Sequence, residues 1–196
     1  MQAWLARPLD AAGRLLARAG ITPNAVTLAG LGVAMTLALT LAAQLYWISL
    51  ALLGLNRLLD GLDGAVARAT GRSDLGGYLD SIADYVFYAG VPLGFAFADP
   101  GANALPAAAL LGSFLLTCAS FLAFAALAAK RGVEPSAARQ KSFFYSVGLM
   151  EGTETIAAFV AMHVWPTYFP AIAWVFAVLC LLTAMQRSVI AIRQFR

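Results

Sequence analysis

Long apolar runs alternate along this chain with short polar or helix-breaking segments. A helix needs about 20 apolar residues to span the hydrocarbon core of a bilayer. The pattern predicts six such helices, over residues 25–44, 47–70, 75–98, 105–129, 143–164 and 171–192. Asp99-Pro100-Gly101 is typical of the turns expected between them. We therefore predict an all-α integral membrane protein with six transmembrane helices.

The first twenty residues have a different pattern. Trp4, Leu5, Leu15 and other apolar residues are interspersed with arginines, which predicts an amphipathic helix in the membrane interface. Thr22 is placed to cap the helix that follows, with Pro23 as its first residue. We expect residues 1–20 to form the interfacial helix and residues 21–196 the transmembrane domain.

The basic residues fall on alternate connections, which predicts the orientation. The side of the N-terminus receives Arg7, Arg14, Arg18, Arg68, Arg72, Lys130, Arg131, Arg139, Lys141, Arg193 and Arg196. The opposite connections, near Leu45, Asp99 and Pro166, contain no Lys or Arg. Because cytoplasmic loops carry the excess of Lys and Arg, both termini are expected in the cytoplasm.

Composition excludes an ordinary soluble enzyme. The 196 residues are 61% hydrophobic and 12% charged, whereas soluble domains are about half apolar and a quarter charged. Six spans leave no room for a separate soluble domain, so any chemistry must lie within the bundle or at its rim. No nucleic-acid partner is expected.

Four aspartates lie in the second and third predicted spans: Asp60, Asp63, Asp80 and Asp84. Helical spacing puts each pair on one stripe of its helix. With a rise of about 1.5 Å per residue from the turn at residues 71–74, Asp63 and Asp80 lie roughly 10 Å deep, and Asp60 and Asp84 roughly 15 Å deep. The two antiparallel helices thus bring four carboxylates to matching depths near the cytoplasmic face.

Four carboxylates in one low-dielectric site cannot all remain ionised unaided, because like charges repel strongly there. Oxygen ligands in this number suit hard divalent ions, Mg²⁺ or Mn²⁺, and could hold two of them. Such a metal pair with open positions binds phosphate oxygens and stabilises both sides of an in-line displacement. The residues therefore predict phosphoryl-group chemistry at the membrane surface.

The segment over residues 60–84 also resembles the signature of the CDP-alcohol phosphotransferases. That signature is D-x-x-D-G-x-x-A-R, eight residues, then G-x-x-x-D-x-x-x-D. We align its first half with residues 60–68, take residues 69–76 as the gap, and place the next glycine at Gly77. Members of the family similarly have six spans, cytoplasmic termini and an N-terminal interfacial helix.

The resemblance implies a reaction in which the hydroxyl of a small polar alcohol attacks a CDP-linked alcohol, releases CMP and forms a phosphodiester. It makes Asp60, Asp63 and Asp80 metal ligands, and Asp84 both a ligand and the general base. In such families the CDP carries either the lipid, as in CDP-diacylglycerol, or the small headgroup, and the resemblance favours CDP-diacylglycerol. A homodimer in a bacterial inner membrane, with its active site facing the cytoplasm, is expected. The residues implied in nucleotide binding are Asn24, Thr27, Gly64, Ala67, Arg68 and Gly77.

The acceptor pocket is less defined by the sequence. Arg139, Lys141 and Arg187 could bind an anionic acceptor such as a sugar-alcohol phosphate, while Glu151 and Glu154 could bind a polyol or an amine-bearing alcohol. Either glutamate could instead pair with a buried Arg187.

Two other residues receive no role in the chemistry. Arg57 is expected to have a structural partner, such as one of the aspartates, and no catalytic role is assigned to it. His163 lies near the far face and is expected to be solvated or interfacial.

Two alternative functions remain open at this stage. An ion- or proton-coupled transporter could use the aspartates as a relay, although no polar residues continue the path to the other face. A membrane prenyltransferase is suggested by Asn56, Asp60 and Asp63, which imitate an aspartate-rich diphosphate motif, but the chain has no second such motif.

Overall fold

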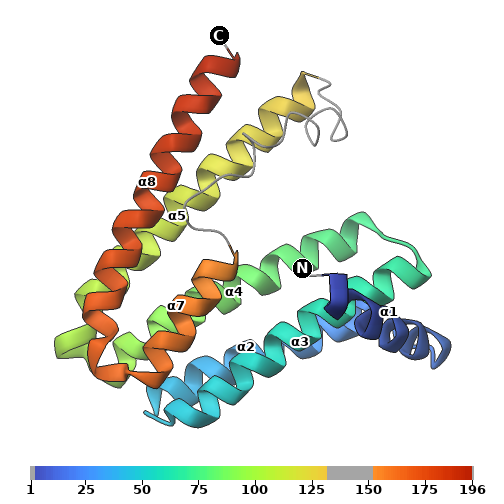
Figure 1. Cartoon of the computed structure of the whole chain (residues 1–196), viewed down its shortest axis with the longest axis horizontal. Helices are drawn as coiled ribbons and strands as arrows, with labels where there is room; N and C mark the ends of the chain where they lie inside the picture. Colours follow the sequence, from blue (N-terminus) through green and yellow to red (C-terminus); the bar gives the residue numbers. More distant parts are fainter. Residues whose placement is uncertain (1–2, 132–151, 196) are drawn as a thin grey trace. The chain divides into compact units, whose positions relative to one another are not determined.

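The computed structural model describes residues 3–131 and 152–195, and these residues form helices joined by short connections (Figure 1). The chain divides into two compact units, residues 1–100 and 101–196.

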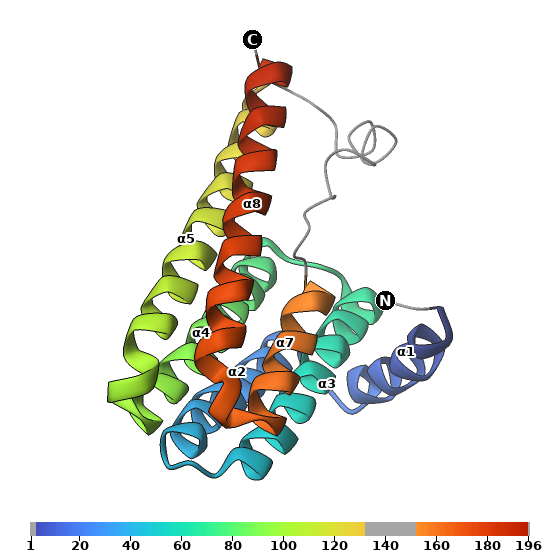
Figure 2. The same cartoon turned by 60° about the vertical axis from the view of Figure 1, so that its left-hand side comes forward.

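Unit 1 consists of four helices. They are α1 (Ala3–Arg18), α2 (Pro23–Ala42), α3 (Tyr46–Thr70) and α4 (Asp74–Ala98). Helix α2 packs against both α3 and α4, and α1 packs against α3 (Figure 2). Because α2 contacts both of the helices that carry the aspartates, it closes the space between them from one side.

Local capping sets the ends of these helices. The Thr22 hydroxyl accepts a hydrogen bond from the Ala25 amide at 3.3 Å, and Pro23 is the first residue of α2, as predicted. Ser73 caps α4 in the same way and accepts from the Gly76 amide at 3.1 Å. Helix α2 ends two residues before the predicted limit, because Gln44 adopts a positive φ of 60°.

Helices α2 and α4 approach closely at Gly94. A Cβ atom there would lie 2.9 Å from the Cβ of Leu41 and 3.0 Å from the Ala38 carbonyl oxygen. Leu41 and Phe95 are fully buried beside this contact. Only a residue without a side chain permits this separation between the two helices.

Helix α1 is attached to α3 by a close contact and an ion pair. Gly13 lies directly against Ala65, with no space for a Cβ atom. Asp10 accepts hydrogen bonds from Arg68, at 2.7 Å from Nη2 and 3.1 Å from Nε. The predicted N-terminal helix is therefore present and is joined to the helix that carries Asp60 and Asp63.

Unit 2 contains α5 (Pro100–Lys130), α7 (Gly152–Val164), the 3₁₀ turn η1 (Pro166–Tyr168) and α8 (Phe169–Phe195). Ring contacts join α5 to α8: Phe124 lies 4.8 Å from Phe195, and Phe114 lies 6.1 Å from Phe176, centroid to centroid. The turn predicted at residues 99–101 is shorter than expected. Helix α4 ends at Ala98 and α5 begins at Pro100, since proline is well suited to the first position of a helix.

The chain is an all-helical integral membrane protein in the part that the structure describes. Four stretches are long and apolar enough to cross a membrane: 23–42, 74–98, 100–130 and 166–193. Helix α3 has 25 residues, but four charged side chains lower its hydropathy. The span predicted over 143–164 extends into residues outside the described ranges, and α7 covers 13 residues of it.

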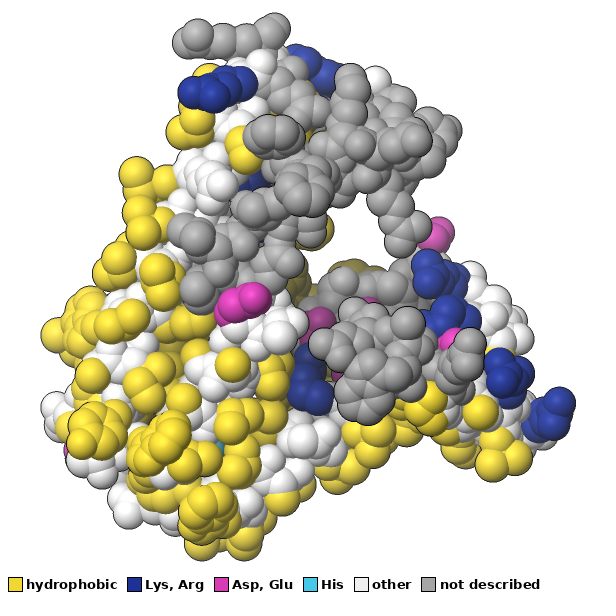
Figure 3. All heavy atoms as spheres, viewed as in Figure 1, with side chains coloured by type: hydrophobic (Ala, Val, Ile, Leu, Met, Phe, Trp, Pro, Cys, Tyr) yellow, Lys and Arg dark blue, Asp and Glu magenta, His cyan; other side chains and the backbone are white. Residues whose placement is uncertain are grey.

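The surface agrees with a lipid environment. Hydrophobic side chains gather over the left and lower parts of the face shown in Figure 3, and basic side chains gather over the α1 end of unit 1. Large apolar side chains are exposed on the candidate spans, for example Leu39, Phe97 and Leu115, each about 70% exposed. In water such a surface would be a liability, and in a bilayer it is expected.

We predict that Gly94→Ala lowers thermal stability in detergent, because the added methyl group collides with Leu41 and Ala38. The cost of overpacking is about 1–3 kcal/mol. Gly112→Ala is the matched control, since no heavy atom of the described residues lies within 4 Å of the added Cβ outside its own helix. The control should raise stability slightly through helix propensity. Equal effects of the two substitutions on the melting temperature would contradict the close packing of α2 and α4.

Candidate functional site

The four aspartates predicted to act together line one small gap between α3 and α4. The gap has a volume of about 10 Å³, close to the space of a single water-sized sphere. Asp63 is buried at 7% exposure, whereas the side chains of Asp60 and Asp84 are 38% and 34% exposed. The gap is thus partly open, and a small ion from solvent can reach its carboxylates.

Thr27 of α2 holds the buried aspartate. Its hydroxyl lies 2.9 Å from Asp63 Oδ2 and 3.1 Å from the Pro23 carbonyl oxygen. A hydroxyl has one proton to donate, and a charged acceptor makes the stronger bond, so Thr27 donates to Asp63. Thr27 was predicted as a nucleotide contact, and in the structure its hydroxyl orients a carboxylate.

Arg57 supplies positive charge to the gap. Its Nη1 and Nη2 each lie 3.2 Å from the same oxygen of Asp84, Oδ1. Its Nη1 is also 3.6 Å from Asp60 Oδ2. The expectation that Arg57 pairs with one of the aspartates is confirmed, and it pairs with two of them.

Uncharged groups hold the same guanidinium. Nε and Nη2 donate to Oδ1 of Asn56, whose amide nitrogen donates to the Gly30 carbonyl oxygen at 2.8 Å. The guanidinium carbon lies 4.0 Å from the ring centroid of Phe87 and 5.9 Å from that of Tyr88. The arginine therefore has partners on α3 and α4 besides the carboxylates.

The chemistry of the gap fits a hard divalent cation. Its donors are carboxylate oxygens, the ligands that Mg²⁺ prefers, and they surround one space. In the described residues, no three Asp, Glu, His or Cys side chains are arranged to coordinate a common ion, and the guanidinium of Arg57 lies beside two of the four carboxylates. Rotation of side chains about the gap would be needed to bring the oxygens together.

A larger cavity of about 300 Å³ adjoins the gap and shares Thr27, Asp63 and Asp80 with it. Five of the six residues predicted to bind nucleotide line this cavity: Asn24, Thr27, Gly64, Ala67 and Gly77. The structure therefore brings together residues of α2, α3 and α4 that the sequence interpretation had grouped by resemblance alone.

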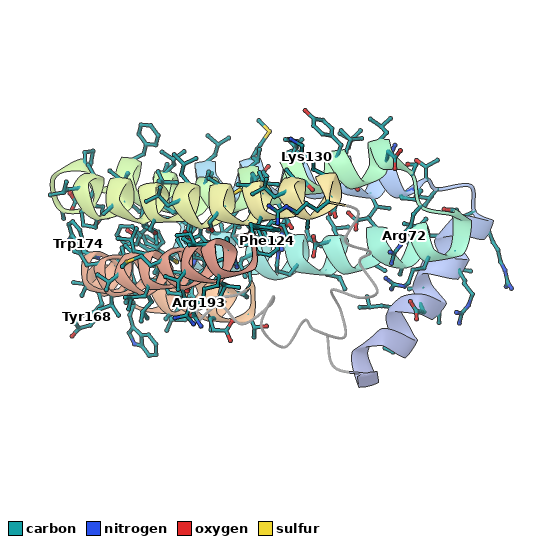
Figure 4. All side chains as sticks on the ribbon, turned by 90° about the horizontal axis from the view of Figure 1, so that it is seen from above. Arg72, Phe124, Lys130, Tyr168, Trp174 and Arg193 are labelled. Atoms are coloured by element: carbon teal, nitrogen blue, oxygen red, sulfur yellow. The ribbon has the colours of Figure 1, made fainter. Side chains whose placement is uncertain are left out.

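Other residues of the cavity were missed. The structure adds Pro23, Gly71, Arg72, Ser73 and Gly76 to its lining. Arg72 lies on the connection between α3 and α4 (Figure 4). All of these except Pro23 belong to the sequence segment 69–76, which was interpreted as a mere spacer between the two halves of the aspartate motif. The sequence did contain a signal for these residues. The connection between the two aspartate-bearing helices is short, so its residues had to lie near the site that those helices form.

The alignment of the second glycine needs correction. Gly76, and not Gly77, stands four residues before Asp80, so the G-x-x-x-D half of the signature begins at Gly76. The spacer between the two halves of the signature therefore has seven residues, 69–75. A Cβ atom on Gly76 would lie 3.0 Å from Ser73 Oγ and 3.2 Å from Asn24 Oδ1. For Gly77, no described residue outside its own helix comes within 4 Å. Gly76 permits close approach of α2, and Gly77 faces open space in the cavity.

Arg68 occupies a different place from the other predicted nucleotide residues. It is not part of the cavity lining, and it pairs with Asp10 of α1 rather than with any of the four aspartates. Its Nη1 lies 3.3 Å from the position of a Cβ on Gly64. The guanidinium is thus held at the edge of the site by helix α1.

The predicted acceptor residues are only partly described. Arg139, Lys141 and Glu151 lie outside the described residues. Arg187 of α8 donates from Nη1 to the Thr117 carbonyl oxygen at 3.1 Å and to Ser120 Oγ at 3.4 Å. The described partners of Arg187 are thus oxygens of α5, Glu154 is exposed in the first turn of α7, and pairing of Arg187 with Glu151 lies outside the described residues.

The expectation for His163 is wrong. The side chain is 1% exposed, and its Nδ1 lies 2.7 Å from the Phe159 carbonyl oxygen. The hydrogen bond within α7 gives one ring nitrogen a partner, which reduces the cost of burying the ring.

Comparison with known proteins identifies the family. The family model for CDP-alcohol phosphatidyltransferase matches residues 20–186. The inner membrane protein YnjF of Escherichia coli (strain K12) is 47% identical over 174 residues, which cover 89% of this chain and 84% of that protein. The phosphatidylinositol phosphate synthase of Mycobacteroides abscessus is 32% identical over 187 residues, covering 88% and 78% of the two chains.

Solved structures show the same fold. The phosphatidylinositol phosphate synthase of Mycobacterium tuberculosis with CDP-DAG bound superimposes with a TM-score of 0.73 at 22% identity and covers 94% of each chain. The same enzyme in complex with manganese and citrate gives a TM-score of 0.74 at 21% identity, covering 93% of this chain and 88% of that one. Taken with the family match and the 47% identity to YnjF, these likenesses show that this chain belongs to the CDP-alcohol phosphatidyltransferase family, whose enzymes depend on a divalent metal.

Proposed function

We propose that this phosphatidyltransferase uses CDP-diacylglycerol as donor and a small polar alcohol as acceptor, with its chemistry at the aspartate gap. The observation that carries the proposal is the shared lining of the two spaces. Four carboxylates line a gap for small cations, and a cavity of about 300 Å³ beside it has two of the same carboxylates in its wall. A nucleotide in the cavity would place its diphosphate next to the carboxylates.

Two observations support a donor that carries the lipid: the apolar surface of the unit that contains the site, and a similar enzyme with such a donor bound. The helices that form the gap belong to an integral membrane unit with an apolar surface, so an acyl-bearing donor can reach the gap from the bilayer. The structurally similar synthase of M. tuberculosis has CDP-DAG bound.

Two divalent ions, Mg²⁺ or Mn²⁺, would be held by Asp60, Asp63, Asp80 and Asp84. When bound, they supply positive charge to the phosphate oxygens and to the leaving group. The likeness to a structure in complex with manganese supports this assignment. Thr27 keeps Asp63 oriented toward the gap through its 2.9 Å hydrogen bond.

Different residues of the chain would then have different roles in the reaction. Asn24, Gly64, Ala67 and Gly77 leave room for the nucleotide. Asp84 accepts the proton of the acceptor hydroxyl as that oxygen attacks the phosphorus. The new oxygen–phosphorus bond forms while the bond to CMP breaks, and CMP carries away the displaced electron pair. General-base catalysis of this kind contributes about 10²–10⁴-fold.

For the acceptor, we favour an alcohol that carries a phosphate. Arg187 presents a guanidinium on α8 that the described structure leaves without a carboxylate partner, and Arg139 and Lys141 would add further positive charge. The relative from M. abscessus is named as a phosphatidylinositol phosphate synthase. Acceptor binding by Glu151 and Glu154 would instead select an uncharged polyol or an amine-bearing alcohol.

The arrangement in the membrane follows from the basic residues. We propose six spans in residues 21–196, with α3 and the segment ending in α7 as the two beyond the four apolar stretches. Both termini and the aspartate gap would face the cytoplasm of a bacterial inner membrane, with α1 lying in the interface. Formation of a homodimer stays a prediction from the family resemblance.

Incubation of the detergent-purified chain with CDP-diacylglycerol, Mn²⁺ and single acceptors tests the substrate assignment. The panel comprises glycerol phosphate, inositol phosphate, inositol, serine and choline, with the lipid product read by mass spectrometry. We expect product with a phosphorylated alcohol. Turnover restricted to inositol, serine or choline would reject the assignment of Arg187 to an anionic acceptor.

Removing one carboxylate tests the role of the aspartates. We predict that Asp80→Ala lowers the rate of CMP release by about two orders of magnitude or more. The substitution removes a proposed ligand of the divalent ions, and with it part of the positive charge that stabilises the phosphate oxygens in the transition state. Asp99→Asn, which changes an aspartate outside the gap, is the control and should retain activity. Near-normal turnover by Asp80→Ala would refute the proposed metal site.

Filling the cavity tests the nucleotide site separately from the metal site. We predict that Gly77→Leu abolishes CDP binding while Mn²⁺ binding persists, because the new side chain enters the open space beside α2 and α3. Gly32→Leu makes the same substitution at an unobstructed position of α2 and should bind CDP normally. Binding can be measured by isothermal titration calorimetry, and tight CDP binding by Gly77→Leu would place the nucleotide elsewhere.

A further inference from the structure

We propose that Arg57 is a resident cation of the aspartate gap, and that a divalent ion must displace its guanidinium from Asp60 and Asp84 in order to bind. The inference rests on the proposed metal site. It assigns to Arg57 the control of metal affinity at that site, a role that the aspartate signature does not contain.

The contacts of Arg57 with the carboxylates overlap with those that a metal would need. Two of its nitrogens lie 3.2 Å from Asp84 Oδ1, and one lies 3.6 Å from Asp60 Oδ2. Its side chain is 21% exposed, so water screens these interactions only in part. The arginine and a divalent ion would therefore compete for the same two ligands.

The remaining partners of Arg57 do not depend on the carboxylates. Asn56 accepts from Nε at 3.1 Å, and the Gly30 carbonyl fixes the orientation of the Asn56 amide. The Phe87 ring lies 4.0 Å from the guanidinium carbon, a distance at which a cation is attracted by the aromatic face. When the carboxylates turn to a metal, the guanidinium keeps a hydrogen-bond acceptor and an aromatic ring, so it can move aside without becoming an unpaired buried charge.

The charge balance gives the direction of the effect. The gap contains four carboxylates and one guanidinium in a partly buried setting. Removing the guanidinium increases the negative potential at the gap and releases Asp60 and Asp84. The guanidinium repels a divalent cation at this short separation, so its removal raises the affinity of the gap for that cation by roughly tenfold or more.

The test is a titration of Mn²⁺ into the detergent-purified full chain, with free Mn²⁺ measured by electron paramagnetic resonance. We expect Arg57→Gln to bind Mn²⁺ about tenfold or more tightly than the unsubstituted protein. Arg131→Gln removes the same charge at the end of α5, where Arg131 contacts Phe195, and should leave the affinity unchanged. Equal or weaker Mn²⁺ binding by folded Arg57→Gln would overturn the proposal.

A second variant covers the case in which Arg57→Gln does not fold. Arg57→Lys keeps the positive charge, but its ammonium lacks the planar fork that reaches Asn56, Asp60 and Asp84 together, so it competes less well and Mn²⁺ binds severalfold more tightly. An unchanged or reduced affinity in that variant would also overturn the proposal. The proposed function fails separately, if the unsubstituted protein binds no Mn²⁺ or if Asp80→Ala binds it normally.

Discussion

The compensation of negative charge between α3 and α4 is the constraint on which the rest of this structure depends. Four carboxylates share a gap in a helical membrane unit, where an uncompensated charge is far more costly than in water. The chain provides compensation without a metal: Arg57 pairs with Asp60 and Asp84, and Thr27 donates to Asp63. The aspartates can therefore be kept in place before any ion arrives, and the same groups set how readily an ion is accepted.

The packing of α2 turns this charge arrangement into a site. Close contacts at Gly76 and Gly94 bring α2 against α4, and Thr27 extends from α2 to Asp63 on α3. One helix thus forms a wall of the 300 Å³ cavity and also orients a carboxylate of the aspartate gap. Because the two spaces have Thr27, Asp63 and Asp80 in common, binding of nucleotide and binding of metal are expected to be coupled. Helix α1 contributes from outside through Asp10, which holds Arg68 at the edge of the site.

Much of unit 1 was predictable from the sequence, because its signals are local. Thr22 and Pro23 mark the start of α2, and the periodic spacing of the aspartates puts them on facing stripes of α3 and α4. The family, the transferase class and the dependence on a divalent metal were also identified correctly from the motif and its resemblance. The transporter and prenyltransferase alternatives are replaced by the family match.

The errors have a common physical origin in contacts between helices. Sequence spacing could not show that Arg187 binds the Thr117 carbonyl of α5. The burial of His163 depends equally on its tertiary surroundings. The misplaced second glycine is an error of a different kind, because counting four residues back from Asp80 in the sequence already gives Gly76. Arg57 was interpreted as structural because a lone arginine in a span needs a partner, and its position between two predicted ligands became visible only with the packing of Asn56 and Phe87.

A crystal structure of the full chain soaked in Mn²⁺, with the metal located by anomalous scattering, tests the central claim most directly. Manganese peaks are expected between α3 and α4, about 2.0–2.6 Å from carboxylate oxygens of the four aspartates, the range for Mg²⁺ and Ca²⁺. The guanidinium of Arg57 should have moved off Asp84 toward Asn56 and Phe87. Manganese bound elsewhere, with Asp60 and Asp84 still paired with Arg57 and Asp63 still paired with Thr27, would contradict this assignment.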